Sequence, residues 1–442
     1  MVSASAQTRK YGTSNSTVNW SLNYNGFANG ENLQSSDVKG APAFTTEATA
    51  SSPVGSYPVL LSKGTLTSGN YQFNFVNTEL IIEKALITIT ADNKSKLYGS
   101  PNPEFTYSYS GFMNGEILAS SDVKGKPGYV TTATDNSPAG NYEIEPVLGT
   151  LNSGNYEFAY SKGWLTIGKA ALTITVENKT RKYGTANPNF TVTYNGFVGG
   201  ENLLSSGVIG APALNTAATI LSPVGTYDIK ASAGTLTSDN YLFNFVHGKL
   251  TISKAQLAVN AENKVRPYGT ANPVLTVTYN GFVNNEDFAG SGITGLPEIS
   301  TAAAVTSSAG TYDITVGAGS LASANYELVY NKGTLTIGKV VLTVNVENKS
   351  RTYGAQNPVF TVNYNGFANG ESWANSGITG KPALTTMATP SSPVGNYDIA
   401  GAIGTLSAAN YSFQFNKGTL SIGKALLVVT ADDKAKSYGA EM

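Results

Sequence analysis

The sequence repeats itself at an interval of 85 residues, and this period constrains the fold more than any other feature. Four markers recur: a Tyr-Gly pair, a glutamate five residues after the glycine of a Gly-Phe pair, a turn with a tyrosine, and an Asn-Tyr pair. The Tyr-Gly tyrosines are Tyr11, Tyr98, Tyr183, Tyr268, Tyr353 and Tyr438, and the glutamates are Glu31, Glu116, Glu201, Glu286 and Glu371. The turn tyrosines are Tyr57, Tyr142, Tyr227, Tyr312 and Tyr397, and the Asn-Tyr tyrosines are Tyr71, Tyr156, Tyr241, Tyr326 and Tyr411. A fixed long period predicts an array of repeated modules.

The period also sets the predicted domain boundaries. We expect repeats at 1–84, 85–169, 170–254, 255–339 and 340–424, with 425–442 as the start of a sixth repeat in a longer protein. A copy of this length is long enough to have a small core of its own, unlike solenoid repeats of about 20 to 45 residues. We therefore predict separate modules joined in series.

Within a copy, the apolar residues alternate with polar ones. In the third copy, Leu172, Ile174 and Val176 alternate with threonines, which is the period of half-buried strands. Only the segment 201–206 lacks this alternation, so it is the one candidate for a turn or two of helix. Five or more short strands per copy are expected, in a mainly β fold with an Ig-like sandwich as one alternative.

The junctions between copies are short. The last strand of one copy meets the first strand of the next within residues 165–174, and no Gly/Ser-rich or Pro-rich linker intervenes. Such junctions favour an elongated, semi-rigid rod. If a module of this length is about 30 Å across, five modules span on the order of 150 Å.

Charge and cysteine content exclude several kinds of partner. The chain has 28 Lys and Arg against 29 Asp and Glu, so no net field attracts nucleic acid or an anionic membrane. The absence of cysteine excludes disulfides and thiolate metal sites, and favours a bacterial exterior over a eukaryotic one. There is no run of 18 apolar residues, so we expect no membrane insertion by this segment.

Three motifs in combination carry a resemblance to a known family. The Tyr-Gly pair is followed by Asn-Pro (Asn102-Pro103 and Asn187-Pro188, for example), then by Tyr-Asn-Gly-Phe, and each copy closes on Leu-Thr-Ile-Xaa-Lys-Ala or a close variant. The chain resembles the MBG-type repeat, Tyr-Gly variety, of bacterial surface proteins over essentially its whole length. The first copy departs from the pattern, with Ser14-Asn15 and Thr17 where later copies have Asn-Pro. The resemblance implies a small extracellular module, β-rich and β-grasp-like, of adhesins, and it implies no catalytic residues or cofactors.

The residues that carry chemistry give no enzyme pattern. The only histidine, His247, takes the place of Asn77 and Lys162 in sister copies, so we interpret it as a surface residue. The repeated glutamates lack the neighbouring acids of a calcium site, and a loop hydrogen bond or salt bridge explains them better. A lysine follows an asparagine at the same place in four copies, at Lys94, Lys179, Lys264 and Lys349. This pattern suggests an intramolecular Lys-Asn isopeptide crosslink, but a solvated lysine in a turn is the simpler interpretation.

Trp164 is the best candidate for a contact residue. Its counterparts are Glu79, Lys249, Thr334 and Thr419, so it is predicted to face solvent on a strand. A contact between modules explains it equally well.

Three functions remain open. The first is the stalk of a secreted or cell-surface bacterial adhesin, in which the partners are neighbouring repeats and the ligand binds elsewhere. The second is an array of weak carbohydrate or mucin binders that gains avidity from multiplicity. The third is a filament subunit whose incomplete terminal copies, including 426–442, complete one another by strand addition.

Overall fold

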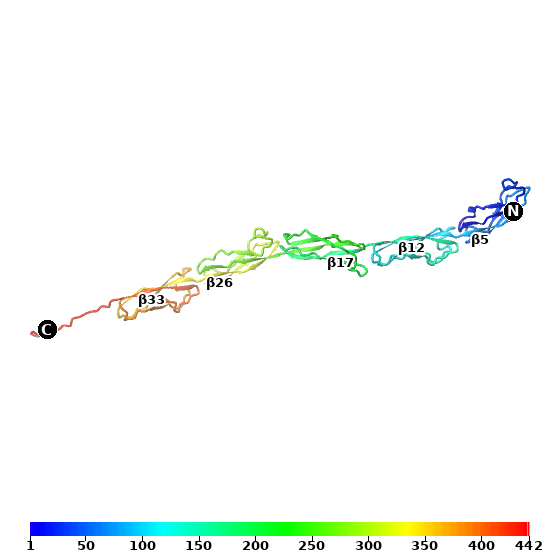
Figure 1. Ribbon diagram of the computed structural model, residues 1–442. Helices are drawn as coiled ribbons and strands as arrows, with labels where there is room; N and C mark the ends of the chain where they lie inside the picture. The colour runs from blue at the N-terminus through cyan, green and yellow to red at the C-terminus, as the bar shows by residue number, and fades with distance from the viewer. Residues whose placement is uncertain (440, 442) are drawn as a thin grey trace. The chain divides into compact units, whose positions relative to one another are not determined.

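A computed structural model describes residues 1–439 and 441, and it confirms a mainly β tandem array of five repeats (Figure 1). The chain divides into two compact units. Unit 1 contains Met1–Glu177, Phe190–Thr216 and Asp228–Gly248, and unit 2 contains Asn178–Asn189, Ala217–Tyr227 and Lys249–Met442. The third repeat therefore contributes residues to both units.

Each repeat contains one three-stranded sheet. Its central strand comes first in the repeat and pairs antiparallel with one neighbour and parallel with the other. In sheet order the strands are β3 (Leu22–Tyr24), β1 (Val2–Ala4), β6 (Phe75–Val76); β10 (Tyr107–Ser110), β8 (Ala85–Ala91), β13 (Tyr156–Ser161); β17 (Val192–Asn195), β15 (Ala170–Val176), β20 (Tyr241–Val246); β24 (Val277–Asn280), β22 (Ala255–Ala261), β27 (Tyr326–Asn331); and β31 (Val362–Asn365), β29 (Val340–Val346), β34 (Tyr411–Asn416).

Each repeat also contains one four-stranded sheet, built from the remaining strands. In sequence order these are β2 (Gln7–Lys10), β4 (Ala43–Thr45), β5 (Gly55–Ser62), β7 (Thr78–Glu83); β9 (Lys94–Leu97), β11 (Gly128–Val130), β12 (Gly140–Val147), β14 (Gly163–Gly168); β16 (Lys179–Lys182), β18 (Ala213–Thr216), β19 (Gly225–Ser232), β21 (Gly248–Ser253); β23 (Lys264–Pro267), β25 (Glu298–Thr301), β26 (Gly310–Gly317), β28 (Gly333–Gly338); and β30 (Lys349–Thr352), β32 (Ala383–Thr386), β33 (Gly395–Ala402), β35 (Gly418–Gly423). The last strand of the repeat lies inside the sheet and pairs parallel with the first of the four.

The predicted alternation is confirmed in the strands. Leu172, Ile174 and Val176 of β15 are buried, while Thr173 and Thr175 between them are only partly buried. Segment 201–206, the candidate helix, forms a turn in which Ser206 N–H donates to the Asn202 carbonyl over 2.9 Å. Among the described residues the one helical element is a 3-10 turn, η1 (Asn15–Thr17), so two sheets per repeat describe the fold better than a β-grasp with a helix.

A single lysine separates the last strand of one repeat from the first strand of the next. In unit 1, β7 ends at Glu83, Lys84 intervenes, and β8 starts at Ala85. The buried positions change there from even to odd numbers, so the lysine acts like the extra residue of a β-bulge. The same spacing separates β14 from β15, β21 from β22 and β28 from β29. The apolar row on the strand is thus continued from one repeat into the next.

The buried clusters extend across the repeat boundaries. One cluster in unit 1 contains Leu80 and Ile82 of the first repeat together with Ile87, Ile89 and Tyr156 of the second. Clusters built from corresponding positions join the second repeat to the third, in unit 1, and the fourth to the fifth, in unit 2. Each repeat also has apolar contacts between its own two sheets, as the fifth repeat does through Val346, Ile399 and Leu420. In addition, the four-stranded sheet of one repeat packs with the three-stranded sheet of the next.

A buried arginine fixes the loop that follows Tyr-Gly. In the third repeat, Arg181 Nε donates to Asn187 Oδ1 over 2.7 Å, and its Nη2 donates to the Thr219 carbonyl. Asn187 Nδ2 in turn donates to the Ala218 carbonyl over 2.7 Å. This network explains the asparagine of the Asn-Pro motif. The first repeat keeps it through Arg9 and Asn15, although η1 replaces the Asn-Pro turn there.

The second repeat has a lysine, Lys96, where the others have this arginine, and the consequence is an unsatisfied acceptor. Asn102 Oδ1 is buried and accepts no hydrogen bond from the described residues. Lys96→Arg is expected to supply the missing donor and to stabilise the second repeat by about 1–2 kcal/mol. Urea denaturation measures the change in unfolding free energy, and hydrogen exchange of the β12 amides shows whether the change lies in the second repeat. The reverse change, Arg181→Lys, is expected to destabilise the third repeat by a similar amount, and equal stability of both variants and the parent chain would contradict the prediction.

Candidate functional site

The repeated tyrosines and glutamates meet at the junctions between repeats. Between the second and third repeats, Tyr98 Oη donates to Glu201 Oε1 over 2.6 Å, and Tyr241 Oη donates to Glu201 Oε2. The two tyrosine rings are edge to face, with centroids 5.6 Å apart. One glutamate thus joins a tyrosine of the preceding repeat to a tyrosine of its own repeat. The equivalent sets are Tyr11, Glu116 and Tyr156; Tyr183, Glu286 and Tyr326; and Tyr268, Glu371 and Tyr411.

The glycine of the Tyr-Gly marker allows the two repeats to approach each other. Gly99 has a φ of +76°, and a Cβ placed on it would lie 2.4 Å from Val198 Cγ2 of the next repeat. The backbone N–H of Val198 donates to Tyr241 Oη over 3.1 Å, which fixes that residue in place. A side chain at the glycine would therefore be opposed both by its backbone conformation and by the neighbouring repeat. Gly12, Gly184 and Gly269 are equivalent, facing Met113, Val283 and Ala368.

Two further contacts cross each junction. The asparagine of the Asn-Tyr marker accepts a hydrogen bond from the turn of the preceding repeat, as from Ala139 N–H to Asn240 Oδ1 over 3.0 Å. The lysine between the strands reaches forward, as from Lys169 Nζ to the Ser238 carbonyl over 2.7 Å. The equivalent asparagines are Asn155, Asn325 and Asn410, and the equivalent lysines are Lys84, Lys254 and Lys339. All four markers found in the sequence therefore contribute to one interface.

The environment of the junction favours neutral tyrosines. Burial, together with the adjacent glutamate, raises the pKa of Tyr241, Tyr326 and Tyr411 to about 12. Burial also raises the pKa of Tyr156 strongly. The cause is that a phenolate there would lose its hydration and face a carboxylate.

These shifts predict that the array loses stability at alkaline pH. A tyrosine whose pKa is raised on folding contributes stability that is present below pH 10 and is lost as the pH rises through about 12. The loss is expected to reach about 1.4 kcal/mol per pH unit for each such tyrosine. Urea denaturation at pH 9 and at pH 11 measures it. A variant with Phe at 156, 241, 326 and 411 should show a smaller difference between the two pH values, and an unchanged difference would contradict the assignment.

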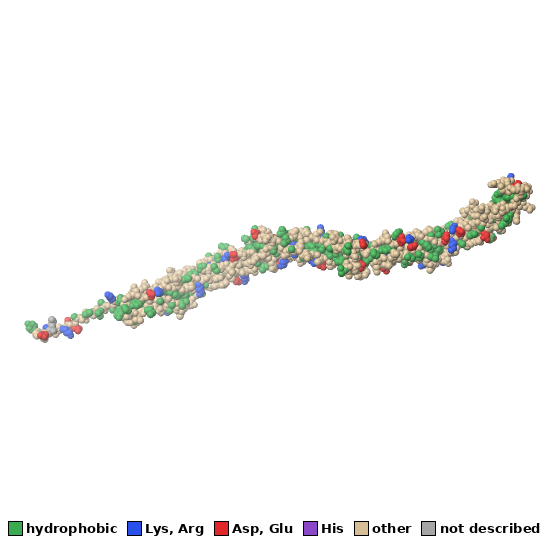
Figure 2. All heavy atoms as spheres, viewed as in Figure 1, with side chains coloured by type: hydrophobic (Ala, Val, Ile, Leu, Met, Phe, Trp, Pro, Cys, Tyr) green, Lys and Arg blue, Asp and Glu red, His purple; other side chains and the backbone are tan. Residues whose placement is uncertain are grey.

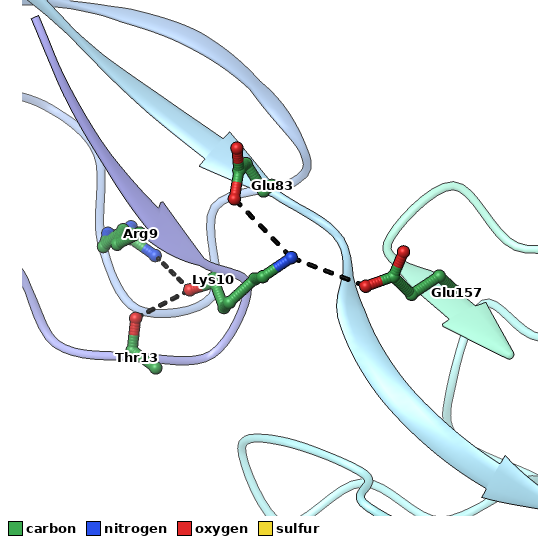
Figure 3. Close-up of polar contacts among 5 residues, drawn as sticks. All are labelled: Arg9, Lys10, Thr13, Glu83 and Glu157. Atoms are coloured by element: carbon green, nitrogen blue, oxygen red, sulfur yellow. Dashed lines mark hydrogen bonds and ion pairs between the residues drawn. The ribbon is translucent and has the colours of Figure 1, made fainter. Parts of the chain in front are cut away.

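The ion pair between Lys162 and Glu143 lies within one repeat, and Figure 2 shows the charged side chains in small, scattered groups on the face it presents. The first junction differs. Lys10 Nζ lies 3.5 Å from Glu83 Oε2 and 3.4 Å from Glu157 Oε1 of the next repeat (Figure 3). All three side chains are about half exposed, so these pairs are worth at most about 1 kcal/mol.

The structure shows the contacts of the candidate site residues that were selected from the sequence. The predicted hydrogen bond of the repeated glutamates is confirmed, and its partners are the tyrosines of two repeats. His247 Nδ1 accepts from Ala231 N–H over 3.2 Å, as Asn77 Oδ1 accepts from Leu61 N–H in the first repeat. The asparagine before each repeated lysine accepts a backbone N–H of the last strand, as Asn93 Oδ1 does from Trp164. Among residues 1–439 and 441, no three acidic or histidine side chains gather as a metal site.

Trp164 lies in β14, and its side chain is half exposed. It faces Glu143 on the neighbouring strand and lines a surface groove with Asn141, Tyr142 and Glu145. Lys162 Nζ is 2.7 Å from Glu143 Oε2 beside it. Its role as a contact residue remains a prediction.

Sequence reasoning found the markers but did not place them together. The sequence spacing did not identify the pairing, because each Tyr-Gly tyrosine also precedes a glutamate of its own copy. In the structure, the tyrosine and the glutamate that binds it are 103 residues apart in three junctions and 105 in the first, which is more than one period. A contact of that separation can only join consecutive repeats. The alternation of apolar and polar residues does not indicate this contact, because it shows that one face of a strand is buried but not which repeat covers that face.

Comparison with known proteins agrees with the repeat. The family model described as MBG domain (YGX type) matches residues 1–81, 87–166, 172–251, 257–336 and 342–421. No curated protein matches the chain. Among solved structures, the I9–I11 tandem of titin is similar at 11% identity and a TM-score of 0.12, covering 77% of this chain and all of that one. An M60 catalytic domain with two CBM51 domains from Clostridium perfringens ZmpB is similar at 8% identity and a TM-score of 0.13, covering 80% of this chain and 40% of that one. Within the described residues, no helix is long and apolar enough to cross a bilayer.

Proposed function

Because the chain belongs to the MBG domain family of the YGX type, we propose that this tandem array is the stiff spacer of a bacterial adhesin. In this role the repeats supply length outside the cell, and a ligand-binding region elsewhere in the protein supplies specificity. The proposal assigns no catalytic role to the chain.

The observation that supports the proposal is the closed junction. Each of the four junctions has the same tyrosine–glutamate contact, the same close glycine approach and a strand continued across it. A shared buried cluster resists bending, because bending would separate apolar surfaces that stabilise by about 25 cal/mol per Å². A flexible linker would carry none of these contacts.

Small-angle scattering of the chain at low concentration tests the spacer role. A rod on the order of 150 Å has a radius of gyration of roughly 43 Å, whereas a compact globule of this length has one of about 22 Å. A variant with Ala at Glu116, Glu201, Glu286 and Glu371 is expected to have a smaller mean radius of gyration than the parent chain. Its circular dichroism spectrum should not change, because the strands stay intact. Glu31→Ala is the matched control, since the tyrosine that donates to Glu31 among the described residues, Tyr71, belongs to the same repeat. A globule-like value for the parent chain would exclude the spacer role.

The cell-surface location is a separate part of the proposal. Antibodies against the array are expected to label intact cells of the source bacterium, and labelling that requires lysis would contradict it. The carbohydrate-binding alternative requires the same exposed patch in every repeat. Trp164 has no aromatic counterpart in the others, so we do not favour that alternative.

A further inference from the structure

The beginning and the end of a repeat run side by side in the same direction. In the fourth repeat, β22 pairs parallel with β27 over six residue pairs that start at Ala255 and Tyr326. β23 then pairs parallel with β28 over four residue pairs that end at Pro267 and Gly338. Partners in both sets are 71 residues apart. The two sets therefore belong to one parallel ribbon, which consists of segments 255–267 and 326–338.

The ribbon stays linked where it passes from the three-stranded sheet to the four-stranded sheet. At this crossover, Asn263 Oδ1 accepts a hydrogen bond from Thr334 N–H over 2.8 Å, so a side-chain amide takes the place of a backbone carbonyl. Gly333 allows the close crossing, because a Cβ on it would lie 2.5 Å from the Ala261 carbonyl oxygen. The equivalent asparagines of the second, third and fifth repeats make the same contact, and they are Asn93, Asn178 and Asn348.

Backbone hydrogen bonds close the ribbon at both ends. Ala255 N–H donates to the Asn325 carbonyl over 3.0 Å at one end, and Tyr268 N–H donates to the Gly338 carbonyl over 2.9 Å at the other. The inward-facing side chains of the ribbon are almost fully buried, and they include Leu257, Val259, Leu335 and Ile337. Water therefore has little access to the hydrogen bonds from this face, and bonds in such surroundings are stronger than bonds in water.

The chain enters and leaves the repeat at opposite ends of the ribbon. Lys254 connects the preceding repeat to the start of segment 255–267, and Lys339 connects the end of segment 326–338 to the following repeat. Tension along the chain therefore pulls the two parallel segments in opposite directions along their own length. The hydrogen bonds between the segments lie across this direction, so they share the load and must break together.

A pull on neighbouring ends of the two segments would act differently. The load would then fall on one residue pair at a time, and the ribbon would open stepwise from that end. The barrier to rupture would be lower, although the folded state and its free energy of unfolding would be the same. Resistance to force depends on this barrier, and so on the direction in which the strands are pulled.

We propose that each repeat is a tensile clamp, and that the array transmits force from one repeat to the next without unfolding. The observation that carries the proposal is the parallel ribbon, which recurs with the same register in the second and fifth repeats. The clamps act in series, because a single lysine joins the last strand of one repeat to the first strand of the next. This inference rests on the proposed function, since a spacer carries tension when the cell holds one end and a bound ligand holds the other.

Single-molecule pulling on the full chain from two pairs of attachment points tests the proposal. The chain has no cysteine, so two introduced cysteines define where the force is applied. Gln256→Cys with Thr336→Cys loads the ribbon of the fourth repeat in shear. Gln256→Cys with Glu327→Cys opens the same ribbon from one end, because Gln256 and Glu327 lie opposite each other. At equal loading rate, the rupture force is expected to be higher in shear by about twofold or more, because forced unfolding follows the barrier.

The two cysteine variants are matched in stability. Gln256, Thr336 and Glu327 are all exposed, so both variants are expected to keep the urea midpoint of the parent chain. A difference in rupture force between them then reports on the direction of pulling alone.

Asn263→Ala tests the link at the crossover. The Asn263 side chain is exposed, so its loss leaves no cavity in the core. The variant is expected to lower the rupture force in shear and to leave the force for opening at Gln256 and Glu327 unchanged, because that end is loaded before the crossover. Asn263→Asp retains the acceptor oxygen and is the matched control. An equal loss of force in both geometries would contradict the assignment of this link to the clamp.

Equal rupture forces in the two geometries would overturn the proposal, and so would a lower force in shear. Small-angle scattering of the same cysteine variants without applied force reports on the rod alone. A rod-like radius of gyration together with equal rupture forces would keep the spacer role and exclude the clamp. Failure of the clamp and failure of the proposed function are therefore distinguished.

Discussion

Leu165→Ala in β14 is expected to destabilise two repeats at once. Leu165 is fully buried in a cluster that contains Ile144 and Ile167 of the second repeat with Leu172 and Ile174 of the third. Truncation of the side chain is expected to lower the unfolding free energy by about 2–5 kcal/mol, because buried apolar atoms are lost and a cavity is left behind. Hydrogen exchange is therefore expected to accelerate in β12 and also in β15, across the repeat boundary.

Leu420→Ala in β35 is the matched control. Leu420 is equally buried, but its cluster contains only residues of the fifth repeat, such as Val346, Ile399 and Ile422. The exchange rates of the fourth repeat should not change in this variant. If Leu165→Ala also left β15 protected, the repeats would unfold independently, and the shared core would carry no coupling.

Gly99→Ala is expected to open the junction between the second and third repeats. The new Cβ would lie 2.4 Å from Val198 Cγ2, and relief of such overpacking costs about 1–3 kcal/mol. The positive φ of +76° adds about 1–2 kcal/mol for any side chain. The expected readout is faster exchange in both flanking sheets and a lower urea midpoint.

Gly354→Ala separates the two contributions. Its φ of +84° imposes the same backbone cost, but no described atom is near its Cβ position. The difference between the two variants therefore measures the contact between repeats. Equal destabilisation in Gly99→Ala and Gly354→Ala would show that backbone strain alone requires glycine in the Tyr-Gly pair.

The sequence predicted the repeat and the strands well, because both depend on local patterns. Leu172, Ile174 and Val176 alternate with threonines in a way that only a half-buried strand satisfies. The period of Tyr98, Tyr183 and Tyr268 needs no structure to be seen. The turn at 201–206 was ambiguous, since its Asn202 and Ser205 favour turns and short helices alike.

The identity of the packing partner was not predictable from these patterns. The alternation predicts that Leu165 and Leu172 are both core residues, but no local sequence pattern indicates that they belong to one core on either side of Lys169. The expectation of separate modules followed from repeat length alone, and length does not determine where apolar faces meet. The prediction that Glu201 is hydrogen-bonded is confirmed, but its two donors, Tyr98 and Tyr241, belong to different repeats, which the sequence did not indicate.

The use of one contact set at every junction has a genetic consequence. Each repeat carries its tyrosine, glycine and lysine toward the following copy, and its glutamate, tyrosine and asparagine toward the preceding one. Unequal recombination between homologous positions of two copies therefore yields a hybrid that still meets both neighbours correctly. Genes of this kind can gain or lose whole copies, and the encoded protein can change its length in units of 85 residues without a mismatched interface.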